Sequence, residues 1–211
     1  LFLLHEIRRD MYSKLRMIMG SDSITGYFLQ AMPIACLAGI IYIVVRLCRT
    51  KKSGVQIKWP TELLRLIFVC YLTGLVSLII LPANFWLYVY DGLVFGWWDE
   101  LGPVFQLGDV DLVPSVIGWL SGELSLGSWV KKMLIGNIAM FVPMGFLLPL
   151  VTKIKDRKNL LRASVLIPLA CEVLQLIFGR SFDIDDLICN FVGILIGAVI
   201  CHCVVRNKKG V

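Results

Sequence analysis

Five stretches of mostly apolar residues, each about 20 residues long, constrain the fold of this chain more than any other feature. They lie near residues 24–47, 62–82, 131–151, 160–178 and 184–205. Backbone amides cannot remain unpaired in hydrocarbon, so segments of this length are expected to cross a membrane as helices. The sequence therefore predicts an all-α integral membrane protein, in which a bundle of about five transmembrane helices forms a single domain over residues 1–211.

The overall composition excludes an ordinary soluble domain. Hydrophobic residues make up 58% of the 211 residues and charged residues only 17%, whereas about a quarter of a typical soluble domain is charged. The mean hydropathy is +0.80. So few charges would not form a polar shell around a core of this size. The net charge of +6 indicates membrane topology and contact with anionic lipid, and we expect no nucleic-acid partner.

Charged residues outside the apolar stretches predict the orientation of the helices in the membrane. The connection between the first two stretches and the connection between the third and fourth are rich in lysine and arginine, as cytoplasmic loops are. Residues 83–129 contain no lysine or arginine but several acidic residues, which is typical of an extracytoplasmic loop. We therefore expect a cytoplasmic C-terminus and place the aspartate-rich segment 179–190 on the outer side.

Two segments outside these stretches are expected to lie at the membrane surface. Residues 85–98 (FWLYVYDGLVFGWW) are too aromatic to be freely solvated, and Asp91 and Gly92 interrupt them too early for a span. Their tryptophans and tyrosines favour headgroup depth, so interfacial anchoring is preferred over a role in covering a ligand. Residues 1–20 have apolar positions at helical spacing and several basic residues, which predicts an amphipathic helix.

Polar residues concentrate at the outer ends of the last three apolar stretches. Ionisable groups at membrane depth are costly and therefore indicate a functional site. Asp186, Asn190, Gly193 and Gly197 lie along one face of the last helix, and the glycines allow another helix to approach closely. The residues that we predict to bind a ligand are Asn137, Glu172, Gln175, Arg180, Asp183, Asp185, Asp186 and Asn190.

A structural interpretation accounts for part of this set. Asp183 and Asp186 have the spacing of a helix N-cap and its capping-box partner, and Arg180 would then neutralise them. The asparagines would join helices by hydrogen bonds. This interpretation does not explain Glu172 and Gln175, which lie inside the fourth stretch, where a carboxylate needs a partner or a water-filled cavity. A functional polar pocket therefore remains the preferred interpretation.

Three segments together resemble the VanZ-like family of bacterial membrane proteins. They are NIAMFVPMGFLLP (137–149), EVLQ (172–175) and GRSFDIDDLICNFVGILIG (179–197). The segment DLVPS (111–115) is similar to a further family segment, with Asp111 and Ser115 replacing the usual asparagine and aromatic residue. The resemblance implies a protein of the bacterial cytoplasmic membrane, in a family named for a member that gives low-level teicoplanin resistance. It implies no particular reaction.

Three functions are compatible with these residues. The preferred one is a non-enzymatic protein that binds a lipid-bearing glycopeptide or a cell-wall or membrane lipid at an outward-facing pocket, with Arg180 pairing with a phosphate or carboxylate. The second is an enzyme acting on lipid head groups, with Mg²⁺ or Mn²⁺ held by Asp183, Asp185 and Asp186. The third is a lipid flippase or transporter that uses Glu172 for proton coupling.

No resident cofactor or metal is expected, apart from this alternative divalent cation at the aspartates. Cys201, His202 and Cys203 resemble a set of metal ligands, but adjacent positions on a helix point to different faces. We therefore interpret this triplet as part of an ordinary membrane helix.

Overall fold

The computed structural model describes residues 13, 14, 17, 24–53, 56–82, 84–103, 105–115 and 128–207. Five of its helices are long and apolar enough to cross a membrane, which confirms the predicted fold class. They are α2 (Ile24–Ser53), α3 (Trp59–Ile80), α6 (Ser128–Val151), α7 (Arg157–Ile177) and α8 (Ile184–Asn207). The predicted amphipathic helix over residues 1–20 lies almost entirely outside the described residues.

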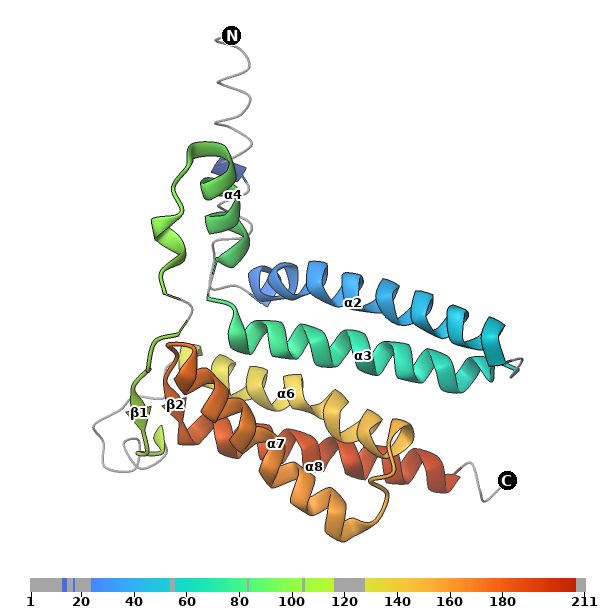
Figure 1. The fold of residues 1–211 in the computed structure, drawn as a ribbon. Helices are drawn as coiled ribbons and strands as arrows, with labels where there is room; N and C mark the ends of the chain where they lie inside the picture. The colour runs from blue at the N-terminus through green and yellow to red at the C-terminus, as the bar shows by residue number, and fades with distance from the viewer. Residues whose placement is uncertain are drawn as a thin grey trace.

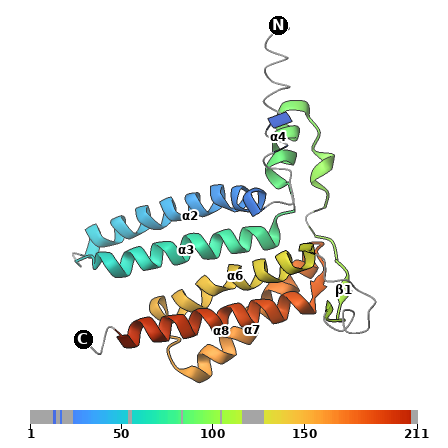
Figure 2. The same cartoon turned by 180° about the vertical axis from the view of Figure 1, so that it is seen from behind.

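The long helices form a pair and a three-helix group that pack side by side (Figure 1). Helix α2 packs against α3, and α3 in turn contacts α6 and α7. The most extensive contact in the described chain joins α6 to α8. Figure 2 shows the same arrangement from behind, with α8 running beside α6 toward the C-terminus. Helix α3 therefore connects α2 to the rest of the bundle.

Glycines bring α6 and α8 into backbone contact. A Cβ atom at Gly197 would overlap the carbonyl oxygen of Val142, and one at Gly145 would overlap that of Ile194. Gly193 approaches the carbonyl of Ile138 in the same way. The small-residue stripe predicted on the last helix thus faces protein, because two helices can approach this closely only where side chains are absent.

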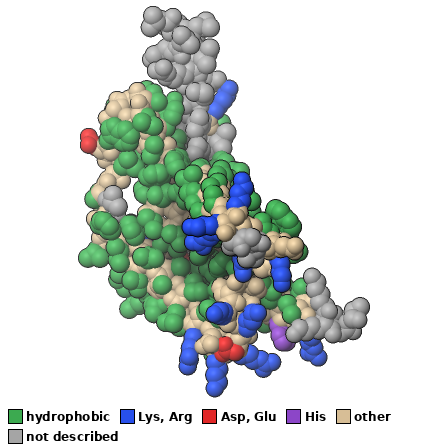
Figure 3. Space-filling model, turned by 45° about the vertical axis from the view of Figure 1, so that its right-hand side comes forward, with side chains coloured by type: hydrophobic (Ala, Val, Ile, Leu, Met, Phe, Trp, Pro, Cys, Tyr) green, Lys and Arg blue, Asp and Glu red, His purple; other side chains and the backbone are tan. Residues whose placement is uncertain are grey.

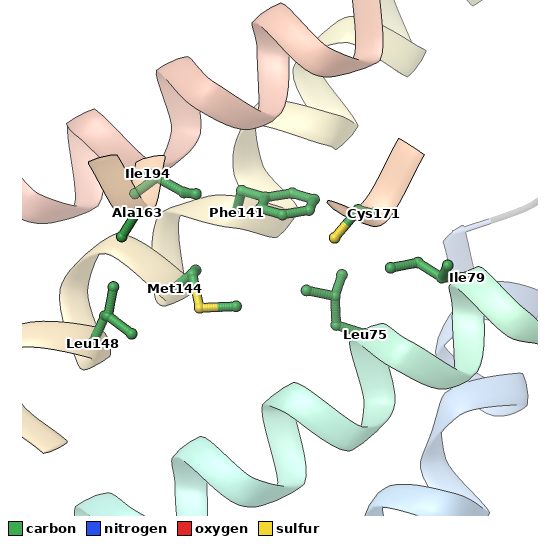
Figure 4. Packing of buried hydrophobic residues seen from close by; sticks show 8 residues of the cluster. All are labelled: Leu75, Ile79, Phe141, Met144, Leu148, Ala163, Cys171 and Ile194. Atoms are coloured by element: carbon green, nitrogen blue, oxygen red, sulfur yellow. The ribbon is translucent and has the colours of Figure 1, made fainter. Parts of the chain in front are cut away.

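The apolar core lies where α3 meets the three-helix group. Side chains of α3, α6, α7 and α8 meet there, and Figure 4 shows Phe141 and Met144 lying among the others. The buried members of the cluster are Leu75, Ile79, Phe141, Met144, Leu148, Ala163, Cys171 and Ile194. The hydroxyl of Tyr71 adds a polar link, because it donates to the carbonyl oxygen of Met140 over 2.9 Å. This core fixes α3 relative to the helices that carry the polar residues.

The aromatic segment forms a short helix, α4 (Phe85–Phe95), set at a steep angle to the bundle (Figure 1). It begins after Asn84 and ends at Gly96, both of which adopt the left-handed backbone conformation, with φ of 65° and 78°. The Trp98 ring packs on Gly92, where a Cβ would overlap it. At eleven residues this helix is too short to span a bilayer, which needs about 20.

Basic side chains gather at one end of the bundle, which we call the basic end. It carries the α2–α3 and α6–α7 connections and the C-terminal end of α8, and Figure 3 shows the concentration of Lys and Arg there. Buried Glu62 lies near this end and bonds to Arg46 at 2.7 Å, Arg65 at 2.8 Å and the Tyr42 hydroxyl at 2.7 Å. The opposite end, which we call the loop end, carries α4 and two short strands.

Candidate functional site

A strip of extended chain at the loop end positions the polar residues. Strand β1 (Val110–Asp111) pairs in parallel with β2 (Phe182–Asp183), so that Asp111 lies opposite Asp183. Before the strand, the Gly108 amide donates to the Leu176 carbonyl over 2.9 Å. A Cβ at Gly108 would overlap the Arg180 backbone, so only glycine fits this crossing. The strip therefore holds the end of α7 and the start of α8 together.

Glu172 is the most deeply buried carboxylate of the site, with 0% of its surface exposed. It lies on α7, and its Oε2 atom accepts the backbone N–H of Asp183 over 3.1 Å. With its amide nitrogen turned toward Glu172, Gln175 lies 3.0 Å from both carboxylate oxygens. A buried carboxylate is tolerated only where it accepts hydrogen bonds, and the Asp183 N–H and the Gln175 amide are its donors here. Both residues belong to the set that the sequence predicts to bind a ligand.

Asp183 caps the N-terminus of α8. Its side chain accepts the Asp185 N–H over 2.8 Å, as the predicted N-cap should. The predicted capping box does not form, because the Asp183 N–H donates to Glu172 of α7 and not to Asp186. Burial raises the pKa of the Asp183 carboxyl above its ordinary value. The helix start is thus closed by a carboxylate from a neighbouring helix.

The side chains of Asp185 and Asp186, in the first turn of α8, bond to different partners. The Asp185 side chain is buried and accepts the backbone N–H of Ser115 over 2.8 Å. Asp186 accepts a hydrogen bond from the side-chain amide of Asn137 on α6. The first bond ties α8 to the segment after β1, and the second ties α8 to α6. The aspartates therefore do not converge on one point.

Asn190 supplies the open hydrogen-bonding group of the site. It lies one turn beyond Asp186 on α8, and only 4% of its surface is exposed. Its Oδ1 atom is buried and has no hydrogen-bond partner among the described residues. A buried acceptor left unpaired costs about 1–3 kcal/mol, so such an atom requires an explanation.

Arg180 lies at the exposed edge of the cluster, in the turn between α7 and β2. Its guanidinium donates to the Leu78 carbonyl oxygen over 2.6 Å, in the last turn of α3. The structural interpretation gave Arg180 the role of neutralising the aspartates, but Arg180 forms no ion pair with a carboxylate in the described part of the chain. It binds a helix C-terminus, where a cation is favoured.

The described residues contain no group of three or more His, Cys, Asp or Glu side chains placed to hold a metal ion. The Asp183 and Asp185 carboxylates already accept backbone N–H groups. In the Cys201–Cys203 triplet the first cysteine is buried, whereas His202 and Cys203 are exposed.

Comparison with known proteins assigns the family. The family model described as VanZ/LLP1 matches residues 68–206, which includes every residue of the candidate site. The chain belongs to the VanZ/LLP1 family. Neither the curated proteins nor the solved structures contain a match to the chain. Together with the five apolar helices, the match identifies a multi-pass membrane protein of this family.

Sequence reasoning missed the backbone partners within this VanZ/LLP1 region. The Leu78 carbonyl and the Ser115 amide are main-chain groups, and nothing in their side chains indicates that they contact the site. Segment 111–115 did carry a signal, because it resembled a family segment, although two of its residues depart from the pattern. Its position in the structure beside β2 and Asp185 gives a physical reason for a constrained sequence there.

Proposed function

We propose that this protein is a VanZ-type factor that binds a lipid-bearing amphiphile at the polar cluster and contributes to teicoplanin-type resistance. The observation that carries the proposal is the buried Oδ1 atom of Asn190, an acceptor without a partner among the described residues. It lies on the same face of α8 as Asp186, one turn away. A ligand hydroxyl or amino group would supply the missing donor.

Arg180 would supply the complementary positive charge. Its side chain is exposed, and its described hydrogen bond goes to a backbone carbonyl, which a phosphate or carboxylate oxygen would replace with a stronger charge-assisted partner. Ligand binding would therefore exchange the Leu78 contact for an ionic one. The proposed ligand has an anionic group together with hydroxyl or amino donors, as lipoglycopeptides and lipid-linked cell-wall intermediates have.

An apolar tail would lie against the outer surface of the helices. The described helices expose many large apolar side chains, including Val173 on α7 and Ile188 on α8, both close in sequence to polar members of the cluster. A tail in the membrane and a head group at the cluster would bind together, because each buried methylene adds about 0.8 kcal/mol to membrane partitioning. This arrangement accounts for the preference for an amphiphile over a soluble ligand.

The test is a titration of the purified full-length chain in nanodiscs with teicoplanin and with a lipid-linked cell-wall precursor. Arg180→Ala should weaken binding of the accepted ligand by roughly 10- to 100-fold, the range expected for a lost hydrogen bond to a charged group. Arg206→Ala, an exposed arginine at the basic end, is the matched control and should leave affinity unchanged. Unchanged affinity in Arg180→Ala would remove this residue from the binding site.

Resistance is tested separately in cells. Expression of the wild-type chain in a susceptible bacterium should raise the inhibitory concentration of teicoplanin, and Arg180→Ala should abolish the increase at equal protein abundance. Arg206→Ala should retain it. If both variants protect as well as the wild type, resistance does not depend on this cluster.

A further inference from the structure

A groove at the basic end lies well away from the polar cluster. It has a volume of about 940 Å³ and is formed by the end of α6, the start of α7 and the end of α8. Figures 1 and 2 both show α7 diverging from α8 toward this end. The volume lies near the upper limit of the roughly 300–1,000 Å³ that is typical of sites for small organic ligands. The groove is therefore large enough for part of a lipid.

The walls and the rim of the groove differ in chemistry. Its apolar lining includes Leu160 and Leu161 of α7 and Leu195, Val199 and Val205 of α8. Its polar lining is basic, consisting of Lys155, Arg157 and His202, and no acidic side chain is among the described residues that line it. Leu161 and Val199 are also exposed on the outer surface of the helices, with 53% and 62% of their surfaces accessible. The groove is thus accessible to a chain from the surrounding membrane.

The two cations of the rim are available to a ligand. Lys155 and Arg157 are exposed, and neither forms an ion pair with a carboxylate in the described part of the chain. Asp156 lies between them in sequence. Its carboxylate accepts hydrogen bonds from Asn159, from the backbone N–H over 3.0 Å and from the side-chain amide over 2.7 Å. That acid serves as the N-cap of α7, and it forms no ion pair with Lys155 or Arg157 in the described part of the chain.

We propose that this groove is a binding site for an anionic glycerophospholipid. One acyl chain lies between α7 and α8, and the phosphate head group contacts Lys155, Arg157 and His202. Apolar walls below a cationic rim match the two halves of such a lipid, since acyl chains favour hydrocarbon and phosphates favour lysine and arginine. A zwitterionic lipid would have the same acyl contacts but would bring its own positive charge to the rim.

Native mass spectrometry of the full-length chain in detergent, titrated with phosphatidylglycerol and with phosphatidylcholine of the same acyl chains, tests the site. Phosphatidylglycerol should bind more tightly. The double variant Lys155→Ala/Arg157→Ala should lose about 30-fold in phosphatidylglycerol affinity, because each basic side chain near anionic lipid contributes roughly fivefold. Inorganic phosphate should not compete, since it lacks the acyl chain.

Two further variants distinguish lipid binding in the groove from general electrostatic attraction of anionic lipid to the basic end. Lys153→Ala/Lys158→Ala removes the same charge from the same connection, at exposed positions that do not line the groove, and should change affinity by less than about threefold. Val199→Trp should fill the groove and weaken binding without changing the charge. Equal losses in the two double variants, equal affinity for the two lipids, or full binding by Val199→Trp would each overturn the proposal.

Discussion

Glu172 shows how one side chain can serve folding and a binding site together. Its carboxylate accepts the backbone N–H of Asp183, which Asp186 would accept in a capping box, and it also faces the Gln175 amide. Asp186 is thereby left to bond Asn137 on α6. The carboxylate of α7 therefore organises the start of α8, while the neighbouring acid connects α8 to α6. Replacing Glu172 should affect stability before it affects any ligand.

We predict that Glu172→Leu destabilises the protein by roughly 1–3 kcal/mol, because it leaves the half-buried Asp183 N–H without the acceptor that it has in the structure. Glu172→Gln should cost less, since its amide oxygen still accepts that N–H. Val173→Ala, which truncates the adjacent side chain on the outer surface of α7, is the control and should have a smaller effect than Glu172→Leu. Thermal unfolding in detergent, followed by tryptophan fluorescence, measures the differences. Equal melting temperatures for all of them would contradict the observed hydrogen bond.

Asp183 gives the site a pH dependence that can be measured by difference. Burial raises the pKa of the Asp183 carboxyl in the folded protein. The folded state therefore holds this proton more tightly than the unfolded state, which stabilises the fold. That contribution to the free energy of unfolding is complete below the unfolded pKa, near 3.9, and is lost as pH rises through the higher folded pKa. Asp183→Asn keeps an N-cap acceptor but does not titrate. Between pH 3.5 and pH 7 the wild type should lose the stability that the Asp183 proton contributes, whereas Asp183→Asn should not. The stability of Asp183→Asn relative to wild type should therefore increase over this range by about the same amount. A difference that does not vary with pH would contradict the assigned shift.

At the scale of the elements, the α6–α8 contact brings two helix backbones together. Gly197 lies against the backbone of Val142, whereas a Cβ at Gly136 on α6 would meet no atom within 4 Å. Gly197→Ala should force the helices apart and destabilise the protein by roughly 1–3 kcal/mol, as overpacking does. Gly136→Ala should be neutral or stabilising by up to about 1 kcal/mol, because alanine favours helix more than glycine. Comparable losses in both variants would show that helix propensity, and not contact, determines the effect.

The same elements show what the sequence can and cannot predict. Span length and hydropathy predicted the five long helices, with ends that differ by up to six residues from those observed, because the bilayer requires both. The glycine stripe on α8 predicted a buried face but did not identify α6 as its partner. The pairing of β1 with β2 was missed, since backbone hydrogen bonds involve no particular side chain. For the same reason, the bond from Arg180 to the Leu78 carbonyl was not predicted.

The whole molecule has two chemically different ends. The polar cluster, with Glu172 and the start of α8, lies at the loop end together with α4 and the two strands (Figure 1). Lysine and arginine side chains gather at the opposite end (Figure 3). Positive charge near helix ends is retained in the cytoplasm, so this separation supports a cytoplasmic basic end and an outward-facing polar cluster. The proposed binding of an extracellular amphiphile depends on that orientation.

Cysteine labelling in spheroplasts tests the orientation directly. In a background in which all seven native cysteines are replaced, we would introduce Leu107→Cys at the loop end and Lys153→Cys in the α6–α7 connection, both at exposed positions. A membrane-impermeant maleimide should label Leu107→Cys in intact spheroplasts and Lys153→Cys only after permeabilisation, because the charged reagent does not cross the bilayer. The reverse result would place Glu172, Arg180 and Asn190 near the cytoplasmic surface. An amphiphile arriving from outside would then reach the cluster only after crossing the membrane, and the proposed function would require an inward-facing ligand.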